Sequence, residues 1–463
     1  MPFQLVFLWT DVLVYALIAT AAGFGWYASR HEHLRAPWRQ VARRPLAMGA
    51  LVVLAAYVAI GLLDSVHFRE RLPDREERYS FEVKSVLDVV LEPLRSRTER
   101  TYSAPFAAQA YTKETVERAD GTTARIYPRL THGGAHLDDP ADRGADILAR
   151  TAMGLVSGLV VWAILVGAFV AAYRGGGEPY AVALRRLARG GTSVPWRTIL
   201  GALGVLVLLA AVLVRLAPYY HVFGTDQVGI DVFYRSLKSV RTGLVIGTLT
   251  TLVMLPFALL LGVMAGYLRG WVDDIIQYVY TTLSSIPGVL LIAAAILSLQ
   301  VYMANHPESF ATVVERADAR LLFLCIILGI TSWTSLCRLL RGETLKLREI
   351  DYVEAARALG VGRLQIMTRH LFPNVMHIVL ITVVLDFSGL VLAEAVLSYV
   401  GVGVDPSMDS WGNMINSARL EMAREPMVWW SLAAAFISMF GLVLAANLFS
   451  DAVRDAFDPR LRR

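Results

Sequence analysis

Residues 346–375 of this 463-residue chain read KLREIDYVEAARALGVGRLQIMTRHLFPNV, a polar stretch that separates two long apolar runs. Asp351 is followed three residues later by Glu354, an Asp variant of the capping box. In such a box the two side chains satisfy free backbone N–H groups at the start of a helix. The stretch therefore predicts a helix that begins at about Tyr352.

Two glycines mark the predicted end of this helix. Gly360 and Gly362 accept the left-handed conformations that close helices and turn chains. A second helix is predicted from about Arg363 to Pro373, where the next apolar run begins. The stretch thus predicts a short helix–turn–helix that projects from the apolar segments on either side.

One face of the first helix is predicted to be a contact surface. Tyr352, Ala355, Ala356 and Leu359 lie within one helical stripe, and the two alanines leave little side chain between this face and a partner. The alternative is that Ala and Glu occur here only because they are good helix formers.

The composition indicates an integral membrane protein, because hydrophobic residues make up 56% of the chain and charged residues only 18%. A helix needs roughly 20 apolar residues to cross a bilayer. About nine such runs occur, which predicts an all-α, polytopic bundle of membrane helices. They lie near Leu5–Tyr27, Ala47–Val66, Met153–Tyr173, Thr198–Pro218, Gly243–Tyr267, Ile276–Met303, Leu321–Leu340, Val375–Tyr399 and Val428–Ser450.

The placement of arginine predicts the orientation of these spans. Basic residues gather in the loops at residues 30–44, 174–197 and 338–369, and the tail adds Arg454, Arg460, Arg462 and Arg463. Short loops rich in Arg and Lys stay in the cytoplasm. The first run has no basic region before it, so we expect it to be a retained span and not a cleaved signal peptide. Nine spans then place every basic loop on one side, with the N-terminus outside and the C-terminus cytoplasmic. The net charge of +5 is read as orientation information and not as a nucleic-acid patch.

The long segment at residues 68–149 then lies outside the cytoplasm. Its charges are mixed, and alternating stretches such as RYSFEVKSVLDVV indicate a small folded insert. Roughly 80 residues suffice for a modest core. Trp429 and Trp430 fit an aromatic belt at the predicted outer interface of the membrane.

No metal site or catalytic residue is predicted. The insert contains THGGAHLDD, with His132, His136, Asp138 and Asp139, but its glycines break the helix that would align two histidines, so a loop is favoured. The two cysteines, Cys325 and Cys337, lie in or beside one predicted span and are expected to be packing residues.

The Glu-Ala-Ala tripeptide at residues 354–356 has a Gly four residues after its second Ala and a Pro thirteen residues beyond that. This pattern resembles the EAA loop of ABC importer permeases, here at about residues 346–374. In that family the loop forms the coupling helix, which docks into a groove on an ATP-hydrolysing subunit.

Further stretches are similar to the permeases of dipeptide, oligopeptide and nickel import, and in particular to the second permease type of the pair. HVFGTDQVGIDVFYRSL resembles their outer motif, and AGYLRGWVDD, LAEAVLSYVGVG, SWGNMINSAR and NLFSDAVRDAFDPRLR follow in the family's order. The residues of the outer motif that match are Gly224, Thr225, Asp226, Gly229 and Asp231.

The resemblance covers residues 196–463 and implies a type I ABC importer permease core there. Two departures stand out. Ile230 occupies a position where an Arg is expected, which puts any charge contact there in doubt. Residues 1–195 match nothing in the family, whose members usually have about six spans, and are predicted to be an extension with three extra spans and the insert.

The resemblance also implies a set of partners: a homologous second permease subunit, two ABC ATPase subunits and an extracytoplasmic substrate-binding protein, working in membrane lipid on a peptide substrate. The chain contains no GxxxxGK[ST] phosphate loop and no Gly-Lys pair. ATP and Mg are therefore expected in the partner ATPases, with no cofactor in this chain. The predicted role is mechanical, in the bacterial inner membrane, with no enzymatic activity.

Within the loop, the resemblance assigns roles to individual residues. Asp351 and Glu354 are expected to shape the helix, with Gly360 and Gly362 forming the turn, and Ala355, Ala356 and Gly360 are expected to contact the ATPase. Arg357 and Arg363 either reach acidic groups on the ATPase or serve only as orientation charge.

Acidic residues inside predicted spans are costly and indicate a cavity or a partner. Asp386 and Glu394 lie two turns apart and are candidates for a translocation path, although a structural hydrogen bond is the commoner role for Glu394. Asp11 is expected to pair with a neighbouring helix. Pro287 is expected to kink its span, either for gating or for packing.

Two other function classes fit the sequence less well. An ion-coupled secondary transporter would also show many spans and intramembrane acids, but it needs no docking loop. A membrane-anchored enzyme acting through the insert lacks any nucleophile–base or metal-ligand spacing. The insert has two candidate roles, a cap over the outer mouth of the transporter or a contact with the binding protein. The alternative is that it only packs against its neighbours and has no role in transport.

Overall fold

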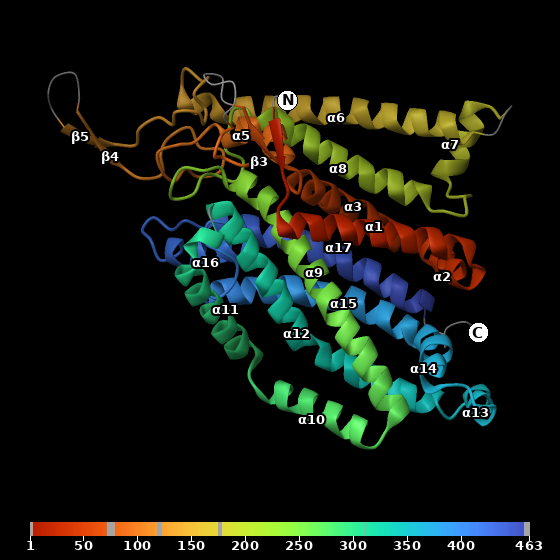
Figure 1. Cartoon of the computed structure of the whole chain (residues 1–463). Coiled ribbons are helices and arrows are strands. Elements are labelled where there is room, and N and C mark those ends of the chain that lie inside the picture. Colours follow the sequence, from red (N-terminus) through yellow and green to blue (C-terminus); the bar gives the residue numbers. More distant parts are fainter. Residues whose placement is uncertain (1–2, 72–78, 118–122, 175–177, 311, 458–463) are drawn as a thin grey trace. The chain divides into compact units, whose positions relative to one another are not determined.

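The computed structural model describes residues 3–71, 79–117, 123–174, 178–310 and 312–457, and it is mostly helical (Figure 1). Among these residues, nine helices are long and apolar enough to cross a membrane, which confirms the predicted number. Arg460, Arg462 and Arg463, which contributed to the predicted orientation, lie outside the described residues. The nine helices are Trp9–Arg30, Pro45–Asp64, Pro140–Tyr173, Trp196–Leu216, Val232–Leu268, Gly288–Asn305, Val313–Leu347, Arg363–Tyr399 and Trp430–Phe457.

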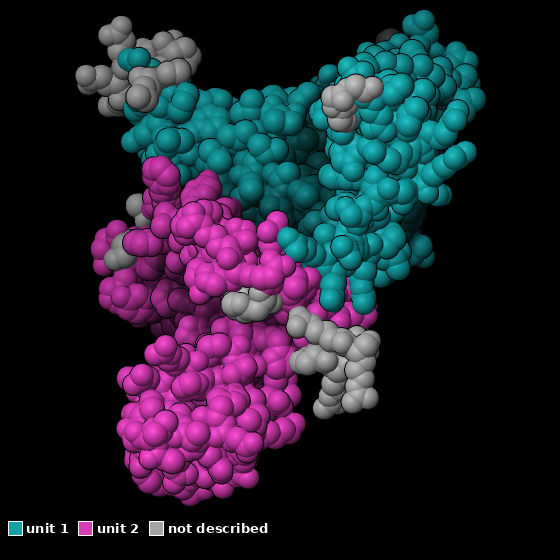
Figure 2. All heavy atoms as spheres, turned by 90° about the vertical axis from the view of Figure 1, so that its right-hand side faces the viewer, with its two compact units in different colours: residues 1–6, 38–242, 409–449 teal, residues 7–37, 243–408, 450–463 magenta. Residues whose placement is uncertain are grey.

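The chain forms two compact units, coloured separately in Figure 2. Unit 1 comprises residues 1–6, 38–242 and 409–449, and unit 2 comprises residues 7–37, 243–408 and 450–463. Both units therefore combine residues from before and after position 195, where the sequence predicts the start of the permease core.

The elements of unit 1 include two small sheets. Strands β1, β2 and β3 form one antiparallel sheet, in which Phe3 pairs with Glu70 and His67 with Ser85, and β4 and β5 form a hairpin. The elements are β1 Phe3–Val6, α3 Pro45–Asp64, β2 His67–Glu70, β3 Lys84–Ser85, α4 Val86–Val90, α5 Glu92–Arg95, β4 Glu114–Glu117, β5 Thr123–Ile126, a 3₁₀ turn Pro140–Asp142, α6 Arg143–Tyr173, α7 Tyr180–Ala188, α8 Trp196–Leu216 and α16 Trp411–Glu421.

The elements of unit 2 are all helical. They are α1 Trp9–Arg30, α10 Trp271–Ser285, α11 Gly288–Asn305, a 3₁₀ turn Pro307–Ser309, α12 Val313–Leu347, α13 Asp351–Ala358, α14 Arg363–Ile366, the π-helical turn η3 Met367–Leu371 and α15 Phe372–Tyr399. Three further helices, α2 Glu32–Arg43, α9 Val232–Leu268 and α17 Trp430–Phe457, contribute residues to both units.

Helices α6 and α8 lie side by side in unit 1 because small residues let their backbones approach (Figure 1). A Cβ at Gly154 of α6 would lie 2.8 Å from the Cα of Val212, and one at Gly204 of α8 would lie 2.6 Å from Nε1 of Trp162. Close approach at glycines is a common way for membrane helices to associate, since lipid provides no hydrophobic driving force between them.

Helix α12 is central to the core of unit 2. Leu321, Leu324, Cys325, Cys337 and Leu340 on this helix are fully buried. Both cysteines are free thiols in apolar surroundings, as expected for packing residues.

Two predicted span boundaries are wrong. Leu5, predicted to lie in the first span, lies in β1, and the helix begins at Trp9. The predicted span Ile276–Met303 is two helices: α10 ends at Ser285, and α11 begins at Gly288 after Pro287. Proline disfavours helical conformation in the residue before it, and Ile286 is accordingly extended. Of these two helices, only α11, with 18 residues, is both long and apolar enough to span a membrane, since α10 has 15 residues.

The stretch RYSFEVKSVLDVV contains little strand. From Tyr79 on, where the structure describes it, its only regular strand is Lys84–Ser85, and Val86–Val90 forms α4. Ser85 and Asp88 form a capping box at the start of this helix, in which Asp88 N donates to Ser85 Oγ and Ser85 N donates to Asp88 Oδ2. The local cap therefore overrides the alternating pattern.

Candidate functional site

The coupling segment, residues 346–375, forms the predicted helix and turn. Helix α13 spans Asp351–Ala358. Gly360 has φ 78°, and Val361 N donates to Ala356 O at 3.1 Å, so the helix closes at this left-handed residue as predicted.

Three local predictions for this segment are wrong. The N-cap of α13 is Ile350, which has no side chain to cap with, so Asp351 and Glu354 do not form a capping box. Gly362 has φ −62° and ψ 143°, an extended conformation that any residue adopts. The second helix does not end at Pro373, because a proline in the first turn of α15 gives up no helical hydrogen bond. Helix α14, η3 and α15 instead form one membrane-length segment, Arg363–Tyr399.

The buried face of α13 differs from the predicted contact stripe. Val353 and Ala356, which are three residues apart, pack into the core of unit 2 with 1% and 8% exposure. Ala355 is exposed, and Leu359 is 83% exposed. The predicted contact role therefore fits Ala355 and does not fit Ala356, whose side chain packs within its own chain.

A hollow of about 300 Å³ lies beside α13 and carries positive charge. Arg269 Nη2 donates to Glu349 Oε1 at 2.8 Å across it. Four arginines and two glutamates give a surplus of positive charge, which suits an acidic partner surface. The lining residues are Tyr267, Leu268, Arg269, Arg348, Glu349, Val353, Glu354, Arg357 and Arg363.

The two acidic residues predicted inside α15 have different surroundings. Glu394 is buried with 2% exposure and accepts a hydrogen bond from Ser398 Oγ at 2.7 Å, which is a structural role. Asp386 is partly exposed, and its carboxylate has no hydrogen bond or ion pair among the described residues. Asp11, on α1, is buried with 1% exposure, and α1 packs on α12.

A second candidate site is the outer loop, residues 217–231, which holds the five outer-motif residues in unit 1. Gly224 and Gly229 have φ 68° and 79°, so both need the freedom of glycine. Asp226 Oδ1 accepts from the backbone N of Val228 and Ile230, and the backbones of Thr225 and Asp231 form an antiparallel β-bridge. The loop is therefore held by a side-chain acceptor and by its own backbone pairing.

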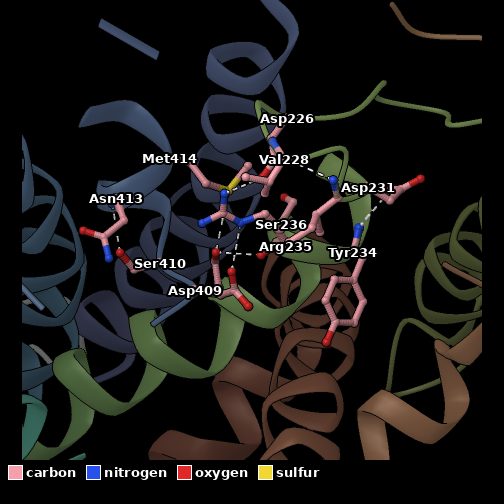
Figure 3. Close-up of polar contacts among 12 residues, drawn as sticks. Asp226, Val228, Asp231, Tyr234, Arg235, Ser236, Asp409, Ser410, Asn413 and Met414 are labelled. Atoms are coloured by element: carbon pink, nitrogen blue, oxygen red, sulfur yellow. Dashed lines mark hydrogen bonds and ion pairs between the residues drawn. The ribbon is translucent and has the colours of Figure 1, made fainter. Parts of the chain in front are cut away.

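Asp231 also starts the helix that follows. Its Oδ1 accepts from the backbone N of Phe233 at 2.8 Å and of Tyr234 at 3.2 Å, as an N-cap does. Figure 3 shows this cap beside Arg235, whose guanidinium bridges Asp226 Oδ2 at 2.8 Å and Asp409 Oδ1 at 3.0 Å.

The first turns of α9 carry further buried charge pairs. Lys238 Nζ lies 2.5 Å from Asp64 Oδ1 at the end of α3 and 3.1 Å from Asp88 Oδ1 in α4. Tyr234 Oη also donates to Asp88 Oδ1, at 2.7 Å. The insert and α9 are therefore joined by charged groups that the sequence analysis did not single out. Basic residues three apart at the start of a membrane helix, Arg235 and Lys238, are the signal that could have found them.

The insert binds the outer loop mainly through Glu99. Its carboxylate accepts from three successive backbone N–H groups, those of Thr131, His132 and Gly133, at 2.8–3.0 Å. Burial acts to raise the pKa of Glu99, but the contact with His221 and the hydrogen bonds from these N–H groups lower it to about 2.

His221 lies between two carboxylates. Its Nδ1 is 2.7 Å from Asp231 Oδ2, and its Nε2 is 3.5 Å from Glu99 Oε1. Burial acts to lower the pKa of His221, but the hydrogen bond with Asp231 and the contact with Glu99 outweigh it and raise this pKa to about 9. A buried imidazolium thus links the insert to the outer motif at neutral pH.

Backbone hydrogen bonds complete this contact. Glu99 N donates to Gly229 O at 2.9 Å, and Thr225 N donates to Ser103 O at 3.1 Å. A Cβ at Gly229 would overlap the Glu99 carbonyl oxygen, so glycine is needed there for close approach as well as for its φ. Insert and outer loop are thus interleaved parts of one structure.

The structure also places the other residues that the sequence analysis named in the insert and near the outer loop. His136 Nε2 lies 2.8 Å from Asp146 Oδ2, and among the described residues no His, Cys, Asp and Glu cluster could hold a metal ion. Trp430 is 1% exposed and donates from Nε1 to Thr225 O at 2.9 Å, so its predicted place in an exposed aromatic belt is wrong, whereas Trp429 is half exposed. Ile230 carries no charge, and the guanidinium that pairs with Asp226 of this loop belongs to Arg235 on α9.

Nine candidate spans, an EAA segment on an exposed helix and a folded outer loop define a membrane permease. Residues 258–463 match the family model described as "Binding-protein-dependent transport system inner membrane component".

Among curated proteins, the chain is 33% identical over 244 residues to the glutathione transport system permease protein GsiD of Pectobacterium atrosepticum, covering 52% of this chain and 73% of that protein. It is 31% identical to the oligopeptide transport system permease protein OppC of Haemophilus influenzae, covering 52% and 71%. It is 30% identical to the dipeptide transport system permease protein DppC of Bacillus subtilis, covering 52% and 70%.

The chain belongs to this family of inner membrane components of binding-protein-dependent transport systems. It is a multi-pass permease subunit of an ABC importer, and the ion-coupled alternative is not supported.

Proposed function

We propose that the chain moves peptides or peptide-like solutes across the inner membrane of a bacterium, driven by ATP hydrolysis in separate subunits. The match of the permease core to transport proteins named for glutathione, oligopeptides and dipeptides carries this proposal. Coupling takes place through α13, whose outward face presents Ala355, Glu354 and Arg357.

The complex we propose contains a homologous second permease, two ABC ATPase subunits that bind ATP and Mg, and an extracytoplasmic substrate-binding protein. The chain itself has no phosphate loop, so its part in transport is mechanical and not enzymatic. In this arrangement the N-terminus lies outside, the C-terminus and the coupling segment lie in the cytoplasm, and the insert lies on the delivery side.

The coupling role can be tested with a matched pair of cysteine variants. Ala355→Cys places an exposed thiol on α13, and Ala356→Cys places a buried thiol one residue away. We expect a bifunctional thiol reagent to crosslink Ala355→Cys to the ATPase in the assembled complex and to leave Ala356→Cys uncrosslinked. Absence of any Ala355→Cys crosslink, or labelling of this residue by a membrane-impermeant reagent from outside, would overturn the coupling role and the orientation.

We propose that Asp386 lines the translocation path and that Glu394 serves structure. Asp386 is partly exposed in a membrane helix and makes no polar contact among the described residues, so its charge is available to a solute's amino group. Asp386→Asn is expected to reduce peptide uptake at least about tenfold while the complex still assembles. Normal uptake by this variant would remove Asp386 from the path.

For the insert, we propose a contact with the binding protein, since it lies on the delivery side in this orientation. The contacts between the insert and the outer loop limit which variants can test this proposal. Deleting residues 68–149 would remove the partners that Thr225 and His221 have in the insert, so loss of transport could reflect loss of the folded outer loop. Charge reversal on the β4–β5 hairpin is the cleaner test, because the described residues of this hairpin make no hydrogen bond or ion pair with the outer loop. Unchanged affinity for the binding protein would contradict the proposal.

A further inference from the structure

A pocket of about 290 Å³ lies at the end of α11 in unit 2, and none of its lining residues belongs to the two sites above. Three segments form it: the last turns of α11 and the turn after it, the first turns of α12, and the loop that follows α15. Its lining residues are Gln300, Met303, Ala304, Pro307, Arg316, Arg320 and Asp405.

Arg320 forms the fixed base of this pocket. It is 7% exposed, and its Nε donates to the Gly403 carbonyl oxygen at 3.2 Å. With its amide oxygen turned toward the arginine, Gln300 accepts from Nη1 at 2.9 Å. Asp405 lies 3.7 Å from Nη1 and also accepts from Ser407, so it neutralises this guanidinium only in part.

Arg316 supplies a second positive charge one helical turn earlier. It is exposed, lines the same pocket, and among the described residues its guanidinium has no hydrogen bond or ion pair. The pocket thus contains two guanidinium groups and one carboxylate. Planar guanidinium donors pair well with the oxygens of carboxylates and phosphates, so the surplus charge favours an oxyanion.

The remaining wall of the pocket is apolar. Met303, Ala304 and Pro307 form it. Leu297 and Val301, which precede Ala304 on the same face of α11, are 55% and 62% exposed. An aliphatic group attached to the oxyanion could therefore continue along α11 into the hydrocarbon region.

We propose that this pocket binds an oxyanion, carboxylate or phosphate, that carries an aliphatic group. Two sources share this chemistry: the phosphate of an anionic phospholipid and the carboxylate of a transported solute. All residues that line the pocket belong to this chain, so oxyanion binding can be tested independently of the coupling role.

The test uses the purified full-length chain in neutral detergent and four probes. Dioctanoyl-phosphatidylglycerol is compared with dioctanoylglycerol, which has the same acyl chains without phosphate, and trialanine is compared with trialanine amide. Arg316→Gln is expected to weaken binding of the oxyanion probe at least about tenfold, because a charge-assisted hydrogen bond is lost. The matched control is Arg143→Gln, which removes an exposed arginine at the start of another membrane helix and is expected to change affinity less than about twofold.

The probes separate the two sources. Binding of phosphatidylglycerol but not dioctanoylglycerol, lost in Arg316→Gln, identifies a lipid phosphate, and binding of trialanine but not its amide identifies a solute carboxylate. Met303→Trp keeps both arginines, fills the pocket and should block the same probe. If no probe binds the unaltered chain, or if Arg316→Gln and Arg143→Gln behave alike, the pocket is not an oxyanion site.

Discussion

The outer loop and the coupling segment are both polar connections between membrane helices, yet the protein holds them by different means. The outer loop is fixed by buried charges, with Glu99, His221 and Asp231 almost fully excluded from water. The coupling segment is held mainly by Val353 and Ala356 in an apolar core, and its polar side chains are exposed. A region tied down by buried charges is costly to rearrange, whereas one that leaves its polar face exposed can meet a partner.

The largest expected effect is at Glu99. Glu99→Ala removes the acceptor of three backbone N–H groups and leaves the His221 imidazolium with one carboxylate. We expect a loss of about 3–5 kcal/mol in the free energy of unfolding of the outer loop, measured by hydrogen exchange of residues 217–231. The control Glu114→Ala, in the same insert but at the surface, should cost no more than about 0.5 kcal/mol. Equal effects would mean that the buried charge does not hold the loop.

Each of the two regions contains a glycine in the left-handed conformation, so substitutions of these glycines allow a direct comparison of the outer loop with the coupling segment. Gly229 has the Glu99 backbone against it, whereas Gly360 has nothing within 4 Å of a Cβ position. Gly229→Ala should cost roughly 3 kcal/mol, from strain and overlap together, and Gly360→Ala about 1 kcal/mol, from conformation alone. Chemical denaturation of the two variants in detergent measures both. A larger cost at Gly360 would reverse the comparison.

The buried charges also predict a pH dependence. The folded pKa of His221, about 9, lies above its ordinary value of 6.5, so its contribution is complete below pH 6.5 and is lost as pH rises through 9. The folded pKa of Glu99, about 2, lies below its ordinary value of 4.5, so its contribution is complete above pH 4.5 and is lost as pH falls through 2. Stability of the outer loop should therefore be greatest between about pH 4.5 and 6.5. We expect on the order of 2 kcal/mol to be lost by pH 9.

Hydrogen-exchange protection of residues 99–106, followed from pH 5 to pH 9 after correction for the intrinsic exchange rate, measures this loss. The variant His221→Gln should flatten the upper limb of the profile. Residues 351–358, whose helix has no comparable buried pair, serve as the internal reference. A profile of the same shape in both segments would contradict the assignment to His221.

Neighbouring alanines in α13 provide a finer comparison. Ala356→Leu adds volume to a filled core and should destabilise unit 2 by about 1–3 kcal/mol, whereas Ala355→Leu should change stability by less than about 0.5 kcal/mol. ATPase activity of the assembled complex should show the opposite sensitivity, because Ala355 faces outward. Thermal unfolding and ATP turnover of the two variants separate packing from docking.

The smallest effect is expected at Asp351. Because this residue is the first of the helix and not its cap, Asp351→Ala loses only a favourable interaction with the helix dipole, about 0.3–1 kcal/mol. A capping box would have cost more, since two backbone N–H groups would lose their acceptors. Hydrogen-exchange protection of residues 351–358 in Asp351→Ala distinguishes the small loss expected from the helix dipole from the larger loss expected from a capping box.

The sequence predicted the features that depend on local chemistry. Nine apolar runs, the short helix before Gly360 and the burial of Cys325 and Cys337 follow from periodicity, glycine and composition. The sequence predicts a break at Pro287, but its consequence, two separate helices, depends on the conformation of Ile286. Asp351 was misplaced because Ile350 takes the cap position, a shift of one residue that spacing alone does not determine.

Contacts between distant segments could not be predicted. Glu99 and His221 are more than a hundred residues apart, and no pattern in one sequence reports that they meet. The same holds for Lys238 with Asp64 and for Arg235 with Asp409, whose pairing needs the folded chain. Burial of Ala356 depends on the core of unit 2, so helical periodicity identified a stripe but not which part of it is covered.

Helix α9 is 37 residues long and so measures about 55 Å, while the hydrocarbon core of a bilayer is about 30 Å thick. About 25 Å of this helix, roughly four to five turns, must therefore be accommodated by tilt or must emerge into water. Its opening turns carry Arg235, Lys238 and their carboxylate partners, which are far more easily tolerated beyond the lipid tails than within them. Lipid tails can therefore cover only part of α9, and we expect its opening turns, which pair with Asp64, Asp88 and Asp226, to lie beyond those tails.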